Sequence, residues 1–156
     1  MKITLLVVGK TTDARLEALT EEYCSRLKHY VSFEIRVIPD LSAKGKVSFE
    51  VQKKMEGEQI LKAISPTAQM VLLDERGKEY RSLEFADYLQ KQMSSGRDMV
   101  YVVGGPYGFS KEVYDRANGM VSLSKMTFSH QMIRLLFVEQ LYRGMTILRG
   151  EPYHHE

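Results

Sequence analysis

Apolar residues follow two patterns along this chain, and the two patterns alternate. Short runs of apolar or alternating residues predict β-strands at residues 3–8, 33–38, 69–74, 98–103 and 120–124. Stretches in which apolar residues recur every three or four positions predict helices at residues 13–30, 48–64, 82–96, 111–118 and 132–149. Because strands and helices alternate throughout, we expect an α/β fold with a parallel sheet covered by helices on both faces.

Polar residues mark several of the predicted boundaries. Asp13, Ser48 and Ser110 each stand at the start of a predicted helix, where such side chains cap free backbone amides. The charged residues 75–79 surround a glycine and are expected to form a turn after the third strand. Residues 40–47 include Lys44 and Lys46, and we expect either a solvated connection or a basic loop that contacts RNA phosphates.

The composition is that of an ordinary globular protein. The chain has 156 residues, 44% hydrophobic and 27% charged, without an internal repeat or linker, so we expect a single domain spanning residues 1–156. A net charge of +2 permits a nucleic-acid partner without identifying one. The single cysteine, Cys24, precludes an internal disulfide, and no apolar run approaches the roughly 20 residues of a membrane span. We therefore expect a cytoplasmic protein.

The last predicted helix is apolar over most of its circumference. Apolar residues form a stripe along one side of this helix, and further apolar residues lie on both sides of the stripe. The apolar positions are Ile133, Leu135, Leu136, Phe137, Val138, Leu141, Tyr142, Met145, Ile147 and Leu148. A helix of this kind is buried on more than one side. One side can pack on the sheet, and the other predicts a partner surface and therefore a homodimer. The alternative is a helix that lies deep inside a monomer.

Two glycine-marked or polar turns follow buried strands. The sequence Gly-Gly-Pro-Tyr-Gly at residues 104–108 directly follows the apolar run 98–103. The second segment, residues 123–128, follows the last predicted strand. Glycine removes the Cβ barrier to close approach, and ligands of α/β sheets lie at the carboxyl ends of the strands. We therefore expect these two segments to form two walls of one cofactor pocket.

The common nucleotide-binding loops are absent from the start of the chain. Gly9-Lys10-Thr11 resembles the end of a P-loop, but the first glycine of that motif would have to stand at Thr4, inside the first strand. Gly-x-Gly-x-x-Gly does not follow this strand either. These absences argue against an α/β enzyme that binds a nucleotide or a flavin through such a loop.

Several separate motifs, in the same order along the chain, resemble those of one known family. They are Gly104-Gly-Pro-Tyr-Gly108, Leu123-Ser-Lys-Met-Thr-Phe128, Ser129-His-Gln-Met-Ile-Arg134, Glu139-Gln-Leu-Tyr-Arg143 and the terminal Pro152-Tyr-His154. The chain resembles the RlmH family, the pseudouridine N3-methyltransferases of bacterial large-subunit ribosomal RNA within the SPOUT superfamily. The similarity covers the full length, including Val8-Gly9, residues 54–59 and Leu73-Asp74.

The resemblance implies S-adenosylmethionine as the methyl donor, a homodimer, and a SPOUT-type fold with a C-terminal trefoil knot. It assigns the cofactor site to Leu73, Gly104, Leu123, Ser124, Lys125, Met126, Thr127 and Phe128, and we add Gly105 on steric grounds. A pocket of loop backbone and apolar side chains suits a flat adenine ring with polar edges. A sulfonium carries its own leaving group, so the enzyme's main task is to position the reactants in line. No metal is expected.

The carboxyl-terminal tail supplies the candidate catalytic groups. In the resembling family the matching tyrosine and histidine lie near the target base, which makes His154 the candidate general base and Tyr153 a positioning group. His155 stands where that family often has arginine, so it would contact RNA as a cation only when protonated. The alternatives for this segment are a disordered tail and a metal site. A metal site is disfavoured because adjacent side chains cannot easily face one ion.

Two arginines on the last helix are candidate RNA contacts. Arg134 and Arg143 are expected to face RNA phosphate or the cofactor carboxylate. In the structural alternative, His130 caps the helix and Arg134 pairs with a carboxylate. The rival for the whole chain is a non-catalytic RNA-binding or ribosome-binding α/β module, which has no need of a cofactor pocket. The substrate is expected to be 23S ribosomal RNA within the assembled ribosome, because so small a domain offers little surface for free RNA.

Overall fold

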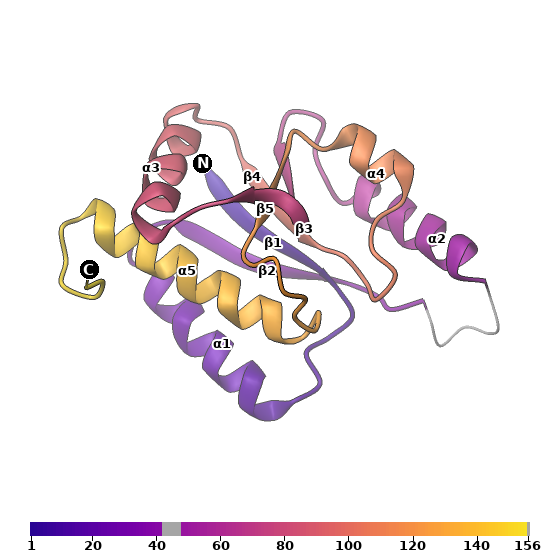
Figure 1. Cartoon of the computed structure of the whole chain (residues 1–156), viewed down its shortest axis with the longest axis horizontal. Coiled ribbons are helices and arrows are strands. Elements are labelled where there is room, and N and C mark those ends of the chain that lie inside the picture. The colour runs from indigo at the N-terminus through magenta and orange to yellow at the C-terminus, as the bar shows by residue number, and fades with distance from the viewer. Residues whose placement is uncertain (42–47, 156) are drawn as a thin grey trace.

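The protein is built on one five-stranded parallel sheet with strand order β2-β1-β4-β3-β5 (Figure 1). The computed structural model describes residues 1–41 and 48–155. Its strands are β1 (Lys2–Val8), β2 (Ser32–Ile38), β3 (Gln69–Glu79), β4 (Met99–Val103) and β5 (Gly119–Ser122). Its helices are α1 (Ala14–Leu27), α2 (Phe49–Lys62), α3 (Ser82–Ser94), α4 (Lys111–Arg116) and α5 (Met132–Leu148). The predicted order of strands and helices is confirmed.

Helices cover both faces of the sheet, as predicted. Successive residues of a strand point to opposite faces, so Leu5 and Val7 of β1 enter one core while Leu6 and Val8 enter the other. The first core also contains side chains of α1, α3 and α5. The second contains side chains of α2 and α4. Because both faces are buried, the central strands are continuous apolar runs.

The helix starts agree with the capping residues expected from the sequence. Asp13, Ser48 and Ser110 each accept a hydrogen bond from a backbone N–H in the first turn of α1, α2 and α4. No helix within the described residues is long and apolar enough to cross a membrane. The expected basic loop with Lys44 and Lys46 lies outside the described residues.

The apolar helix α5 is buried between the sheet and two other helices. Phe137, Val138 and Leu141 are fully buried and belong to the core that α1 and α3 share. Both of these helices pack along α5. One protomer therefore accounts for much of the apolar circumference that we used to predict a dimer, and the homodimer stays a prediction.

The prediction of a charged turn at residues 75–79 is wrong. Strand β3 continues through these residues to Glu79 and pairs with β5 on both sides of an irregularity between Leu73 and Lys78. The pairing brings the β5 backbone against Gly77, where a Cβ would lie 2.7 Å from Met120 C and 2.7 Å from Val121 N. Gly77 therefore allows two strand backbones to approach closely. A glycine among charged residues is also typical of a turn, which is why the sequence pattern predicted one.

Gly77→Ala is expected to destabilise the protein by about 2–3 kcal/mol, because its methyl group would clash with backbone atoms that cannot rotate away. Gly119→Ala is the matched control, since this glycine lies in the neighbouring strand and its Cβ would meet nothing within 4 Å. Chemical denaturation of both variants measures the effect. Equal stability of the two variants would contradict the close approach at Gly77.

Candidate cofactor site

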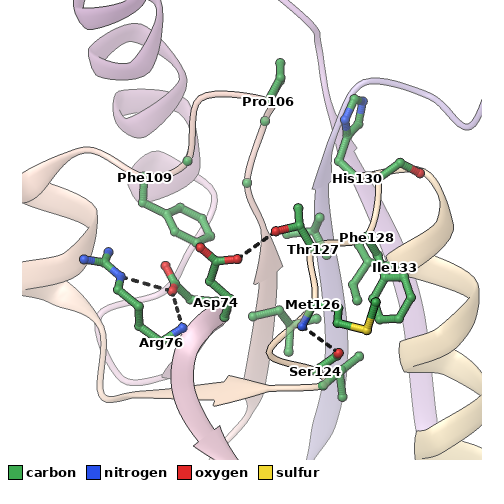
Figure 2. Close-up of a pocket in the computed structure, with 18 of the residues that line it drawn as sticks. Asp74, Arg76, Pro106, Phe109, Ser124, Met126, Thr127, Phe128, His130 and Ile133 are labelled. Atoms are coloured by element: carbon green, nitrogen blue, oxygen red, sulfur yellow. Dashed lines mark hydrogen bonds and ion pairs between the residues drawn. The ribbon is translucent and has the colours of Figure 1, made fainter.

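A cavity of about 560 Å³ lies at the carboxyl ends of β4 and β5, beside residues 73–76 of β3 (Figure 2). Its walls come from residues 73–76 in the middle of β3, the loop after β4 and the loop between β5 and α5. All but one of the predicted cofactor residues line it: Leu73, Gly104, Gly105, Leu123, Ser124, Met126, Thr127 and Phe128. The structure thus brings together two loops that are separate in the sequence, as expected for the two walls of one pocket.

The glycine loop is a tight bend against the cavity. Gly105 and Gly108 form an antiparallel bridge, with the Gly108 N–H donating to Gly105 O at 3.1 Å. Gly108 has a φ of +81°, a conformation that favours glycine. A Cβ on Gly104 would lie 3.0 Å from the buried Phe109 ring. The loop therefore presents backbone, with little side chain, to a ligand.

Hydrogen bonds hold the second wall. The Ser124 hydroxyl accepts from Met126 N–H at 2.9 Å, and the Thr127 hydroxyl donates to Glu75 Oε2 at 2.9 Å (Figure 2). Met126 is 77% exposed, so its apolar side chain stands at the cavity largely in contact with solvent. Lys125 is the exception among the predicted residues, because its ammonium lies 3.7 Å from Glu79 and its side chain points away into solvent.

The third wall carries charged groups that sequence reasoning did not place in the site. Asp74 Oδ2 accepts from the Tyr114 hydroxyl at 2.5 Å, and Asp74 Oδ1 accepts from Arg76 N–H at 2.8 Å. Burial raises the pKa of the Asp74 carboxyl, but these hydrogen bonds outweigh burial and lower the pKa overall. The carboxylate is therefore ionised at neutral pH and can accept hydroxyl donors. Its place directly after the buried part of β3 was the available sequence signal.

His130 also lines the cavity and was not among the predicted site residues. Burial, followed by the positive charge of Arg134, lowers the pKa of its imidazole. The ring is therefore neutral at pH 7 and able to accept a proton. It does not cap the helix, because the N-cap position is Gln131, and the first helical N–H, that of Met132, donates to the Ser129 hydroxyl at 3.1 Å.

Arg134 is a structural residue, which corrects the prediction that it contacts RNA. Its side chain is 1% exposed, and it donates to the carbonyl oxygens of Val8, Gly9 and His130 at 2.8–2.9 Å. These bonds attach the start of α5 to the carboxyl end of β1. A guanidinium enclosed in this way has no face to offer a phosphate. The alternative prediction, that Arg134 pairs with a carboxylate, is also wrong, since its acceptors are carbonyl groups and the Thr11 hydroxyl.

The carboxyl-terminal tail packs back onto α1 and α5, so a disordered tail is wrong for the described residues up to 155. The Tyr153 hydroxyl lies 3.0 Å from both Glu139 Oε1 and the Tyr23 hydroxyl. Arg143 donates to Glu139 at 2.7 Å and lies 3.1 Å from His154 Nδ1. Burial and these two neighbours raise the pKa of Tyr153, which keeps its hydroxyl protonated.

The carboxyl-terminal tail packs against the middle of α5, at Glu139 and Arg143, whereas the cavity is lined by the first turn of this helix. Ile133 lines the cavity, whereas Arg143 contacts His154. At 1.5 Å per residue, these two positions are about 15 Å apart along the helix axis. Neither Tyr153 nor His154 lines the cavity, so the predicted catalytic residues are not brought to the predicted cofactor residues within one protomer.

Comparisons with known proteins agree with this geometry. The family model described as "Predicted SPOUT methyltransferase" matches residues 1–154. The chain belongs to the SPOUT methyltransferase family. Proteins named Ribosomal RNA large subunit methyltransferase H from Porphyromonas gingivalis, Bacteroides thetaiotaomicron and Flavobacterium johnsoniae are 59%, 55% and 52% identical to it, over 100% of both chains. A crystal structure of a methylase family protein from Neisseria gonorrhoeae has the same fold, with a TM-score of 0.54, 11% identity, and coverage of 99% of this chain and 86% of that chain.

Proposed function

We propose that this protein transfers the methyl group of S-adenosylmethionine to N3 of a pseudouridine in 23S ribosomal RNA. The observation that carries the proposal is the cavity of about 560 Å³ between the glycine loop and residues 123–128. Full-length relatives named as large-subunit ribosomal RNA methyltransferases support the choice of substrate class. A non-catalytic RNA-binding module would not need such a cavity.

The residues of the cavity fit this donor. Leu73, Leu123 and Phe128 supply apolar surface for the adenine ring, and the loop backbone supplies hydrogen-bonding groups for its edge. The ionised Asp74 and its neighbour Glu75 can accept hydrogen bonds from hydroxyl groups. The donor supplies an electrophilic methyl on a sulfonium, so the protein has to orient the acceptor and remove a proton from N3.

The proton acceptor is assigned to the tail of a second copy of the chain. His154 contacts Arg143, which lies about 15 Å along α5 from Ile133 at the cavity, and His154 itself does not line the cavity of its own protomer. In a homodimer the tail of one copy can reach the cavity of the other, with Tyr153 positioning the target base. His130 is the second candidate, because it lines the cavity and its pKa is lowered. A knotted C-terminal region and a cytoplasmic location belong to the same proposal.

RNA contacts are assigned to the residues around the tail. His155 is exposed and is placed to meet phosphate. Arg143 is partly exposed and holds Glu139 and His154, so it both positions the tail and offers charge to RNA. With a net charge of +2, the chain has little electrostatic attraction for free RNA, which favours the assembled ribosome as substrate.

Transfer of a labelled methyl group tests this function. The purified protein is incubated with labelled S-adenosylmethionine in three separate reactions. One contains whole ribosomes, one contains large subunits and one contains free ribosomal RNA. We expect label in 23S ribosomal RNA of whole ribosomes, mapping to N3 of a pseudouridine. Label at a different nucleotide would overturn the proposed target. If calorimetry detects no binding of S-adenosylmethionine, the proposed methyltransferase activity is overturned and the non-catalytic RNA-binding module is favoured.

Thr127→Val is expected to weaken S-adenosylmethionine binding by about tenfold, because loss of one hydrogen bond to a charged acceptor, Glu75, frees the loop. Lys125→Ala is the matched control in the same loop, since this side chain faces solvent. Calorimetry of both variants measures the effect. A larger loss in Lys125→Ala than in Thr127→Val would place the ligand outside this cavity.

A further inference from the structure

Helix α2 buries a carboxyl group behind the glycine loop. Glu56 is only 2% exposed, and the one hydrogen bond to its carboxylate within the described residues comes from Gln52 Nε2 at 3.1 Å. Burial, together with the negative charge of Asp40, raises the pKa of the Glu56 carboxyl. A buried carboxylate with a single neutral partner is costly for stability. The fold alone gives no reason for this cost.

The position of Glu56 suggests what the carboxylate does. A Cβ on Gly105 would lie 2.5 Å from Glu56 Oε1 and 3.0 Å from Oε2, so the glycine lets the carboxylate lie directly against this loop, and a side chain there would displace it. Gly105 also lines the cavity. One layer of backbone therefore separates the charge from the space where the methyl donor is proposed to bind.

The helix holds this charge in a fixed place. A Cβ on Gly57 would lie 2.4 Å from the Ser110 hydroxyl, so α2 packs directly against the residue that caps α4. Side chains of Ile60 and Val113 complete the contact between the two helices and the sheet. A charge that cannot relax away from the cavity acts on a ligand more strongly than a solvated one.

We propose that Glu56 selects the cationic methyl donor over its neutral product by placing a fixed negative charge behind Gly105. This inference rests on the proposed use of S-adenosylmethionine. The donor carries a sulfonium charge, whereas S-adenosylhomocysteine carries a neutral thioether and is otherwise the same molecule. On transfer, the bond from sulfur to the methyl carbon breaks, a bond from N3 to that carbon forms, and the N3 proton passes to the base. The attraction to Glu56 is lost with the sulfonium charge, which favours product release.

Glu56→Gln tests the charge with little change of shape. Calorimetry at pH 8 measures the affinities for S-adenosylmethionine and S-adenosylhomocysteine. We expect a loss of about tenfold for the donor and less than about twofold for the product, as a fixed charge pair at low effective dielectric predicts. Glu56→Asp keeps the charge and is expected to keep the preference for the donor. Glu58→Gln removes an exposed charge two residues further along α2 and is the matched control, with both affinities unchanged.

Thermal melting of the ligand-free variants supplies a second measurement. Glu56→Gln is expected to melt at a higher temperature than the parent protein, because a buried charge has been removed. Equal losses of donor and product affinity would overturn the proposal and leave Glu56 with a purely structural role, as would unchanged affinities for both. If the parent protein binds neither molecule, the proposed function fails instead, so the two failures are distinguishable.

Discussion

Deletion of residues 153–156 is expected to lower methyl transfer to ribosomes by at least about 100-fold while leaving affinity for S-adenosylmethionine within about twofold. The first number is the usual contribution of a general base. The second follows because none of the described tail residues, 153–155, lines the cavity of its own protomer. Single-turnover methylation and calorimetry on the same preparation measure the two effects. Retention of full activity would remove the tail from the mechanism.

Mixed dimers decide whether the tail acts on its own cavity or on that of a partner. One chain lacks residues 153–156, and the other carries Gly104→Arg, which fills the cavity. If tails act across the dimer, the mixed dimer contains one intact site, formed by the cavity of the truncated chain and the tail of the blocked one. Mixing two inactive proteins is then expected to restore activity. Absence of activity in dimers proven to be mixed would contradict the assignment of His154 to the partner's cavity.

Tyr153→Phe is the companion to the deletion. It keeps the ring that packs 4.8 Å from Tyr142 and removes only the hydroxyl that Glu139 accepts from. A folded variant with lowered activity separates positioning by the hydroxyl from loss of the whole tail.

Arg134→Met is expected to destabilise the protein by about 3–5 kcal/mol, the second large effect. Methionine fills a similar volume but leaves the carbonyl groups of Val8, Gly9 and His130 buried without this donor. Each buried acceptor left without a donor costs about 1–3 kcal/mol, and the costs are not additive. Urea denaturation measures the change in the free energy of unfolding.

Two further substitutions make the Arg134 experiment specific. Arg134→Lys retains one donor group and is expected to be intermediate in stability. Arg149→Met also removes a bond from a guanidinium to a carbonyl, that of His29 at 3.0 Å, but at an exposed position, and should cost less than about 1 kcal/mol. If Arg134→Met were as stable as the parent protein but bound ribosomes more weakly, Arg134 would contact RNA after all, and its structural role would be contradicted.

Much of the site was visible in the sequence because its parts are local. The strand ending at Val103 and the glycines after it form a bend whatever surrounds them, since glycine and proline restrict the backbone directly. Parallel strands then bring the ends of β4 and β5 to one edge on either side of Leu73 in β3, so the segments 104–108 and 123–128 had to meet. Capping by Ser48 and Ser110 was predictable for the same reason, because each acts within its own helix turn.

The sequence by itself therefore determined the alternation of strands and helices, the capped helix starts and the two loops that enclose the cavity. Tertiary structure alone decided that Arg134 binds the β1 carbonyls, that β3 extends past Gly77 and that Glu56 lies behind Gly105. It also decided that Tyr153 packs against Glu139 and does not line the cavity. The physical reason is the sequence separation of the partners. A periodic pattern reports which face of an element is buried, whereas the identity of the group on the other side depends on how distant segments pack.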